Sequence, residues 1–337
     1  MIIVRAPLRI PVGGGGTDLP SYYSQFCGEW VSAAIDKYVY VVINKIAQPG
    51  FKIRYSKTEE VARPDQIQHP IIREAIKLLK ISDGIEIVSM ADVSTNTGLG
   101  SSSSFTIALL TALHAFLRNT PQDNIPPRQE LAEQACHIAM DLLKEPSGKQ
   151  DEYASACGGL NSFYISQNGG VRIEPLYPQK ISPGQLRELE NNLLMFYTGL
   201  RRDSRDVLAI QAKATHDGEK EMVENLHRVK GIGREIKSVL INGEFHRFGE
   251  LLDLHWQEKT KRMGTSNAQI NQWYEIAKQN GAVGGKLMGA GGGGFFLFYC
   301  EDQKDKHKLR QAMAGQGLEE QLFHFDLDGV KIIADFK

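Results

Sequence analysis

A run of glycines and serines, Thr97-Gly98-Leu99-Gly100-Ser101-Ser102-Ser103-Ser104, is the segment of this sequence best suited to chemistry. It precedes an apolar periodic segment, residues 105–117, that predicts a long amphipathic helix. Glycines let a ligand approach the backbone, and the free N–H groups at a helix N-terminus attract anions. A serine hydroxyl such as that of Ser102 can also bind Mg²⁺. A capped tight turn is the plainer alternative, but four serines leading into the helix favour a phosphate-binding loop.

Two further glycine clusters, 13–16 and 289–294, need an explanation because glycine runs cost backbone entropy. The second contains G-x-G-x-x-G, a dinucleotide-binding pattern that requires a strand before it and a helix after it. The strand-like segment 295–299 follows instead, so we reject a dehydrogenase. The sequence has no G-x-x-x-x-G-K-[ST] motif and no H-R-D or D-F-G motif, which excludes P-loop enzymes and protein kinases.

The composition is that of an ordinary globular protein. The chain has 337 residues, 42% of them hydrophobic and 23% charged, and a net charge of −1. This length suggests two domains, and this charge gives no reason to expect nucleic acid or a membrane as a partner. The four cysteines form no C-x-x-C pair, and the N-terminus does not resemble a signal peptide. We therefore expect a cytoplasmic protein that acts on small molecules, as a monomer or a homodimer.

The elements that must position these loops mix strands and helices in both halves of the chain. We place a domain boundary near residue 175, which gives domains 1–175 and 176–337. The first half is expected to contain strands at 39–43, 51–55 and 85–88, helices at 71–79, 105–117 and 126–143, and a hairpin at 160–173. The second half is expected to contain strands at 193–197 and 321–334, a strand–glycine–strand segment at 284–299, and helices at 205–216, 218–240, 244–262, 267–279 and 304–315.

Three motifs, in this order, resemble those of the GHMP kinase superfamily, which includes galactokinase, homoserine kinase and mevalonate kinase. They are residues 5–18, 97–104 and 286–294, and the resemblance spans nearly the whole chain. It implies an α+β two-domain fold with an ATP-binding N-terminal domain like ribosomal protein S5 domain 2. It also implies a C-terminal ferredoxin-like α/β sandwich, with ATP and the acceptor bound between the domains.

Two segments narrow the resemblance. Residues 5–20 and 148–159 look like those of D-glycero-D-manno-heptose 7-phosphate kinases and related fucokinase domains. This implies an ATP-dependent kinase that phosphorylates the anomeric O1 of the heptose 7-phosphate, for nucleotide-activated heptose synthesis. Galactokinases carry Arg where this chain has Arg9, whereas mevalonate kinases carry Lys, which also favours a sugar. A kinase for another sugar, such as fucose or galactose, and a non-catalytic ATP- and sugar-binding regulator remain alternatives.

The resemblance also implies roles for individual residues. Asp151 is expected to be the general base, with Arg9 beside it to keep it ionised and to stabilise the transferring phosphoryl group. The alternatives are a helix-start charge for Asp151 and a strand-surface ion pair for Arg9. Residues 97–104 are expected to bind the ATP phosphates. The residues expected to contact the substrate are Gly14, Gly15, Thr17, Asp18, Lys149, Arg202, Gly291 and Gly292.

One position departs from the family pattern. Members usually carry a Mg²⁺-binding Glu on the helix before the catalytic Asp, and Ala139 stands there in this chain. Asp141 is the nearest carboxylate, but residues two apart do not share a helix face. Mg²⁺ would then be held by Ser102, the ATP phosphates and water. Ala139 keeps the regulator open as an alternative, whereas Asp151 and Arg9 favour a kinase.

Overall fold

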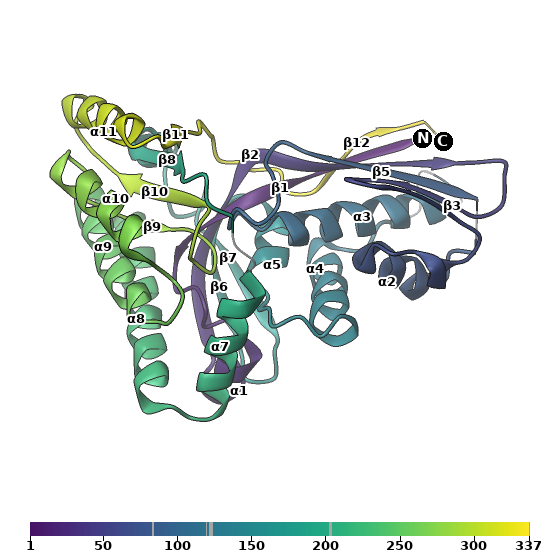
Figure 1. Cartoon of the computed structure of the whole chain (residues 1–337), viewed down its shortest axis with the longest axis horizontal. Helices are drawn as coiled ribbons and strands as arrows, with labels where there is room; N and C mark the ends of the chain where they lie inside the picture. Colours follow the sequence, from purple (N-terminus) through teal and green to yellow (C-terminus); the bar gives the residue numbers. More distant parts are fainter. Residues whose placement is uncertain (83, 119, 121–123, 202–203, 337) are drawn as a thin grey trace.

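Two sheets and the helices that cover them make up the structure (Figure 1). The structure is a computed structural model and describes residues 1–82, 84–118, 120, 124–201 and 204–336. Within the described residues, the first sheet has eight strands and the second has four. No helix of the described residues is long and apolar enough to cross a membrane.

The first sheet is built around a long antiparallel pair, β1 and β2. Its main path has the order β12-β1-β2-β5-β3-β4, and β6 and β7 extend it from the first half of β2. The strands are β1 (Ile2–Gly13), β2 (Gly28–Lys45), β3 (Phe51–Arg54), β4 (Thr58–Val61), β5 (Ile85–Ala91), β6 (Leu160–Ile165), β7 (Val171–Pro175) and β12 (Lys331–Asp335). The expected hairpin at 160–173 is confirmed as the β6–β7 pair.

The helix α3 (Ser101–Leu117) runs against the first sheet (Figure 1). It packs on β1 and β2 and is covered by α2, α4 and α5. Residues 104–113 are all buried, so the expectation of a helix with one polar face is wrong. A helix that is apolar on all sides belongs in a core, because no face of it gains from contact with water.

Three helices of the first half, α2, α4 and α5, pack on α3, and α4 continues into a segment with a different winding. The helices of this half besides α3 are α1 (Pro20–Phe26), η1 (Pro64–Gln66), α2 (Pro70–Leu78), α4 (Arg128–Cys136), η2 (His137–Leu142) and α5 (Gln150–Cys157). The segment η2 is a π-helix that continues α4 directly. Both Ala139 and Asp141 lie in it, and single π turns occur frequently at functional sites.

The second sheet is antiparallel and has the order β11-β8-β10-β9. Its strands are β8 (Leu193–Tyr197), β9 (Gly284–Leu287), β10 (Phe295–Tyr299) and β11 (Glu319–Glu320). The helices of this half are α6 (Pro183–Asn192), α7 (Ser204–His216), α8 (Lys220–Asn242), α9 (Phe245–Thr260), α10 (Ala268–Gln279) and α11 (Gln303–Gly315). Alternate residues of β8 and β10 face two different clusters of apolar side chains, as a period of two requires.

The larger hydrophobic cluster joins the two halves of the chain. It contains Val12 and Trp30 from the first sheet together with Ile236 of α8 and Leu297 of β10. The chain also returns to the first sheet at its end, because β12 pairs with β1. The strand expected at 321–334 is therefore wrong in extent, since only 331–335 form β12. The boundary near residue 175 stays a prediction, and the core extends across it.

Candidate active site

The glycine–serine loop ends at the N-terminus of α3. Gly100 is the N-cap and has φ +79°, and Gly98 has φ +80°. Residues other than glycine rarely adopt these values. The first N–H group bonded within the helix is that of Ser104, which donates to the carbonyl of Gly100. The N–H groups of residues 101–103 therefore remain without helix partners, and with the helix dipole they can receive phosphate oxygens.

The four serines and Thr97 differ in how their hydroxyl groups are used. Ser104 donates to the carbonyl of Pro7 at 2.8 Å, and Thr97 donates to that of Ser94 at 3.0 Å, so both hold the loop in place. Ser102 is exposed. The hydroxyl of Ser101 is buried and has no hydrogen-bond partner. An unpaired buried hydroxyl is costly, which makes Ser101 as good a ligand candidate as the predicted Ser102.

Arg9 and Asp151 form a two-point ion pair directly beside this loop. The Arg9 Nε and Nη2 atoms donate to the two carboxylate oxygens of Asp151 at 2.7 and 2.6 Å. The third nitrogen, Nη1, donates to the carbonyl of Gly98 at 2.6 Å. A side chain at Gly100 would lie 3.3 Å from the Asp151 carboxylate. The expected contact between Arg9 and Asp151 is thus present in the structure, although their catalytic roles stay a prediction.

The loop after β1 carries Asp18, a buried carboxylate. Asp18 Oδ1 accepts from the N–H of Gly16, and Oδ2 accepts from the N–H of Gln150, both at 3.0 Å. Burial raises the pKa of Asp18, and the charge of Asp151 raises it further. The second bond fixes the loop to the start of α5, one residue before Asp151. Asp18 and Asp151 therefore face the same region, as a substrate role for Asp18 requires.

The other predicted residues of this loop shape it. The Thr17 hydroxyl lies 2.8 Å from the carbonyl of Gly14 and 2.9 Å from that of Glu29, so it is occupied by backbone. A Cβ at Gly14 would lie 2.1 Å from the same Glu29 oxygen, whereas a Cβ at Gly15 would be 3.3 Å from Gln150 Oε1. Gly15 is thus the more open of the two, and a contact of Thr17 with substrate stays a prediction.

The third glycine cluster packs on the phosphate loop. A Cβ at Gly289 would lie 2.6 Å from Gly98 Cα, and one at Gly294 would lie 2.1 Å from the carbonyl oxygen of Thr97. Side chains at these positions would separate the two backbones, which explains why both segments are rich in glycine. Gly291 and Gly292, predicted substrate contacts, lie on Thr265, whose carbonyl accepts from the Gly292 N–H at 2.8 Å.

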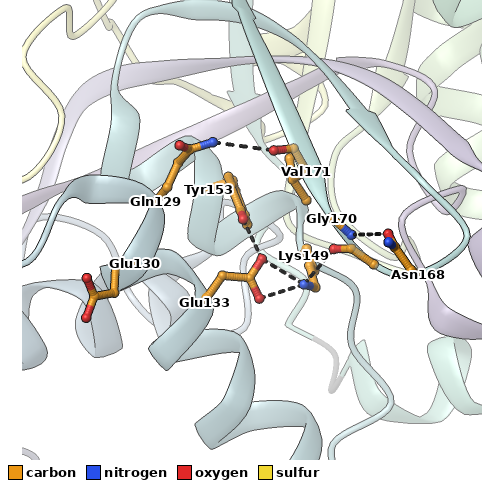
Figure 2. A pocket seen from close by; sticks show the side chains of 9 residues that line it. Gln129, Glu130, Glu133, Lys149, Tyr153, Asn168, Gly170 and Val171 are labelled. Carbon is orange, nitrogen blue, oxygen red and sulfur yellow. Dashed lines mark hydrogen bonds and ion pairs between the residues drawn. The ribbon is translucent and has the colours of Figure 1, made fainter.

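Lys149 lies in a surface pocket between α4, the start of α5 and the β6–β7 turn (Figure 2). Its ammonium group donates to both Glu133 oxygens, at 2.7 and 2.6 Å, and to the carbonyl of Gly169 at 2.9 Å. Tyr153 donates to the same Glu133 carboxylate. Since an ammonium group has three protons, all of them have partners. A substrate contact for Lys149, which stays a prediction, would have to displace one.

The side chains beside the serine loop fit a Mg²⁺ ion only in part. Asp141 is exposed and bonds to His137 Nδ1 at 2.8 Å. The described residues contain no group of three or more His, Cys, Asp or Glu that could hold a metal ion. Glu152, however, accepts from the Ser103 hydroxyl at 2.8 Å, and its buried Oε2 has no partner. Burial, then the charge of Asp151, raises the pKa of Glu152 to about 8. Mg²⁺ often takes one carboxylate besides phosphates and water, so Glu152 fits this role.

Sequence reasoning missed Glu152 because it looked for the carboxylate near position 139 and not on α5. It also missed Arg262 and Gln211, which lie beside Gly16 of the substrate loop. No motif marks these two residues, and only the folding of α7 and of the segment after α9 brings them there. Arg202, a predicted substrate contact, lies outside the described residues.

The comparisons with known proteins agree with this geometry. Residues 70–159 match the GHMP kinases N terminal domain, and residues 236–318 match the GHMP kinases C terminal region. Together these matches cover more than half of the chain. The chain belongs to the GHMP kinase family, whose members are phosphotransferases that use ATP as the phosphate donor. The expected α+β GHMP kinase fold is confirmed.

Individual relatives refine this family assignment. A D-glycero-alpha-D-manno-heptose 7-phosphate kinase of Campylobacter jejuni is 27% identical, over 98% of each chain. A crystal structure named a D-glycero-D-manno-heptose 1-phosphate kinase, from Bacteroides thetaiotaomicron, superimposes over 100% of both chains with a TM-score of 0.79 at 23% identity. An Arabidopsis thaliana fucokinase/GDP-fucose pyrophosphorylase is 23% identical over 92% of this chain, which spans only 31% of that protein.

Proposed function

We propose that this protein transfers the γ-phosphoryl group of ATP to the anomeric O1 of D-glycero-D-manno-heptose 7-phosphate, which gives the 1,7-bisphosphate. The observation that carries the proposal is the two-point Arg9–Asp151 pair, held against the phosphate loop by the Gly98 carbonyl. The Campylobacter jejuni relative, which matches the chain from end to end, supports the choice of sugar. We further propose a cytoplasmic setting, which the four free cysteines support.

The proposed transfer gives each of these residues one role. The O1 atom of the sugar forms a bond to the γ-phosphorus while the bond from that phosphorus to the β,γ-bridging oxygen breaks, and ADP leaves. The proton of the O1 hydroxyl passes to Asp151, whose oxygens each keep a lone pair beside the bond to Arg9. The N–H groups of residues 101–103 hold the phosphates, and Asp18 accepts from sugar hydroxyls.

A metal ion would balance the negative charge of the ATP phosphates. Ser101, Ser102 and Glu152 would hold Mg²⁺ together with the ATP phosphates. When bound, the ion neutralises charge that develops on the phosphate oxygens. Glu152 comes from α5 and not from η2, so the absence of a carboxylate at Ala139 does not leave the site without one.

A coupled assay of ADP release tests the function. The acceptors are D-glycero-D-manno-heptose 7-phosphate, the corresponding 1-phosphate, fucose, galactose and mevalonate, each with ATP and Mg²⁺. We expect turnover with the 7-phosphate, and ³¹P NMR should show the new phosphate on O1. Preference for the 1-phosphate would reverse the position of transfer, and preference for fucose or galactose would replace the substrate. ATP binding without turnover of any acceptor would favour the regulator.

A further inference from the structure

Four cationic side chains are buried together beside the substrate loop. Arg9, Lys259, Arg262 and Lys286 are 4%, 5%, 8% and 2% exposed, respectively. Arg9 is neutralised by Asp151, but within the described residues no carboxylate forms an ion pair with the other three. Glu258, the carboxylate whose charge acts on Arg262, itself pairs with Arg228 and Lys261. Lys259, Arg262 and Lys286, the cation cluster, therefore lie buried without a carboxylate partner among the described residues.

The members of the cation cluster differ in how many of their hydrogen-bond donors have partners within the protein. Lys259 donates to the carbonyls of Leu287 and Gly289 at 2.7 and 2.6 Å, which makes it a clamp on the third glycine segment. Lys286 has one long contact, 3.4 Å, to the carbonyl of Val12. Arg262 donates from Nε and Nη1, but its buried Nη2 has no partner. Arg262 and Lys286 thus have unused donors where unsatisfied donors are costly.

These unused donors lie at the substrate loop. Arg262 Nη1 donates to Gln211 Oε1 at 3.0 Å, and Gln211 Nε2 donates to the carbonyl of Gly16 at 3.3 Å. The N–H of the same glycine is held by Asp18. Lys286 contacts the carbonyl of Val12, just before the loop begins. Arg262 and Lys286 therefore lie close to the loop that carries Asp18, Arg262 through Gln211 and Lys286 through its contact with Val12.

We propose that Arg262 and Lys286 bind a phosphate group carried by the acceptor itself. A guanidinium group with a free N–H and an adjacent ammonium group suit a phosphate dianion. Neutral sugars such as fucose or galactose would leave these buried charges unmatched, so the site selects a sugar phosphate. This inference rests on the proposed function and adds the residues that distinguish a phosphorylated from a neutral acceptor.

Kinetics with a matched pair of acceptors test this inference. We expect the wild type to prefer D-glycero-D-manno-heptose 7-phosphate over unphosphorylated D-glycero-D-manno-heptose by about 100-fold or more in kcat/KM. Arg262→Gln should raise KM for the 7-phosphate by about 10- to 100-fold while kcat/KM for the unphosphorylated sugar changes less than about threefold. Arg262→Lys, which keeps a charge, should restore part of the loss. An equal loss with both sugars would overturn the inference, because it would mean that Arg262 only shapes the loop.

Gln211→Ala is the matched control, because Gln211 joins Arg262 to Gly16 without carrying charge. It should weaken both acceptors alike. Lys286→Met provides a second variant in case Arg262→Gln does not fold, and it should reduce selectivity in the same direction. A loss of ATP affinity in these variants, with acceptor selectivity kept, would assign the cation cluster to the nucleotide and overturn the inference.

A binding experiment separates this inference from the proposed function. Inorganic phosphate is titrated calorimetrically into the protein saturated with a non-hydrolysable ATP analogue, which occupies the phosphate loop. Binding to the wild type that Arg262→Gln weakens tenfold or more would support the phosphate site even if no heptose were turned over. If phosphate and sugar phosphates fail to bind, or if a neutral sugar is the preferred acceptor, the inference is wrong while the kinase assignment stands.

Discussion

Asp151 is held in place by the same side chain that reaches the phosphate loop. The two bonds from Arg9 orient its carboxylate. This orientation matters because the transition state of phosphoryl transfer is loose, and positioning contributes more than proton removal. The Arg9 Nη1 bond to Gly98 then ties the base to the phosphate loop, so one guanidinium group aligns the acceptor side with the donor side.

The substitution Asp151→Asn should separate chemistry from nucleotide binding. The amide keeps the shape of the carboxylate but cannot accept the proton, so we expect turnover to fall about 10²- to 10⁴-fold. ATP affinity, measured by calorimetry, should change little because the N–H groups of α3 are untouched. The matched control is Asp141→Asn, since Asp141 is exposed and bonds only to His137 in the structure. Near-normal turnover of Asp151→Asn would remove this residue from the mechanism.

Lys286 predicts a pH dependence of stability. Burial, then the charges of Arg9 and Arg262, lower its pKa to about 7 from 10.5. Between these pH values the folded chain binds fewer protons than the unfolded chain, so this group makes the free energy of unfolding rise with pH. From pH 7 to 9 the wild type should gain roughly 2 kcal/mol relative to Lys286→Met, because one pKa unit corresponds to about 1.4 kcal/mol. Urea unfolding at both pH values measures this difference.

The control for that measurement is Lys220→Met, whose side chain is 89% exposed. Its unfolding free energy should follow the wild type at both pH values. Parallel pH curves for wild type and Lys286→Met would show that the ammonium group of Lys286 is not perturbed by its buried cationic neighbours.

Sequence reasoning succeeded at residues that belong to local motifs and failed where side chains from distant segments meet. The Arg9–Asp151 contact was expected because a family motif carries each partner. Glu152, Gln211 and Arg262 were not, since nothing in the local sequence says that α5 meets the phosphate loop or that α7 and the residues after α9 meet the substrate loop. A buried polar group is recognisable only when its surroundings are known, because the same residue types are usual on surfaces.

At the level of elements, periodicity predicted most helices within a few residues. It missed α5, and also α1 and α6, two short helices that each begin with a proline. It also treated α3 as amphipathic, although the strands β1 and β2 and the helices α2, α4 and α5 cover it. Apolar residues at helical spacing identify one face of a helix that is buried, but they do not show whether other elements cover the remaining faces.

Two glycines of α8 provide a matched pair for testing how this helix supports the substrate loop. A Cβ at Gly233 would lie 2.9 Å from both Cα and N of Gly14, whereas nothing lies within 4 Å of a Cβ at Gly231. Gly231→Ala should raise the unfolding free energy by about 0.5–1 kcal/mol, because alanine favours helix. Gly233→Ala gains the same helix propensity, but its new methyl group would push α8 away from the substrate loop. We expect lower stability and an acceptor KM raised about tenfold, without loss of ATP affinity.

Thermal unfolding and acceptor kinetics of the two variants measure this contrast. Equal stabilisation in both would show that α8 adjusts without cost. An unchanged acceptor KM in Gly233→Ala would mean that the position of the loop beside α8 does not affect substrate binding.

At the scale of the whole molecule, the two halves share both core and site. The return of β12 to β1 and the contact of Gly289 with Gly98 are made by segments far apart in the sequence. Met195 and Leu297 face the larger hydrophobic cluster, while Phe196 and Phe296, on the same strands, face the smaller one. The second sheet therefore connects the two clusters, and neither half can expose its surface without exposing part of the other.

This coupling predicts one cooperative unfolding transition despite a length typical of two domains. Trp30 lies in the larger cluster, and Trp256 and Trp273 lie in the smaller one, all three buried. In Trp30→Phe the fluorescence reports the smaller cluster, and in Trp256→Phe/Trp273→Phe it reports the larger. Each variant's own urea transition in far-ultraviolet circular dichroism is the reference, so the stability lost through the substitution does not affect the comparison. In both variants the fluorescence midpoint should coincide with the dichroism midpoint. Fluorescence and dichroism midpoints that differ within one variant would mean that the boundary near residue 175 divides two units that unfold independently.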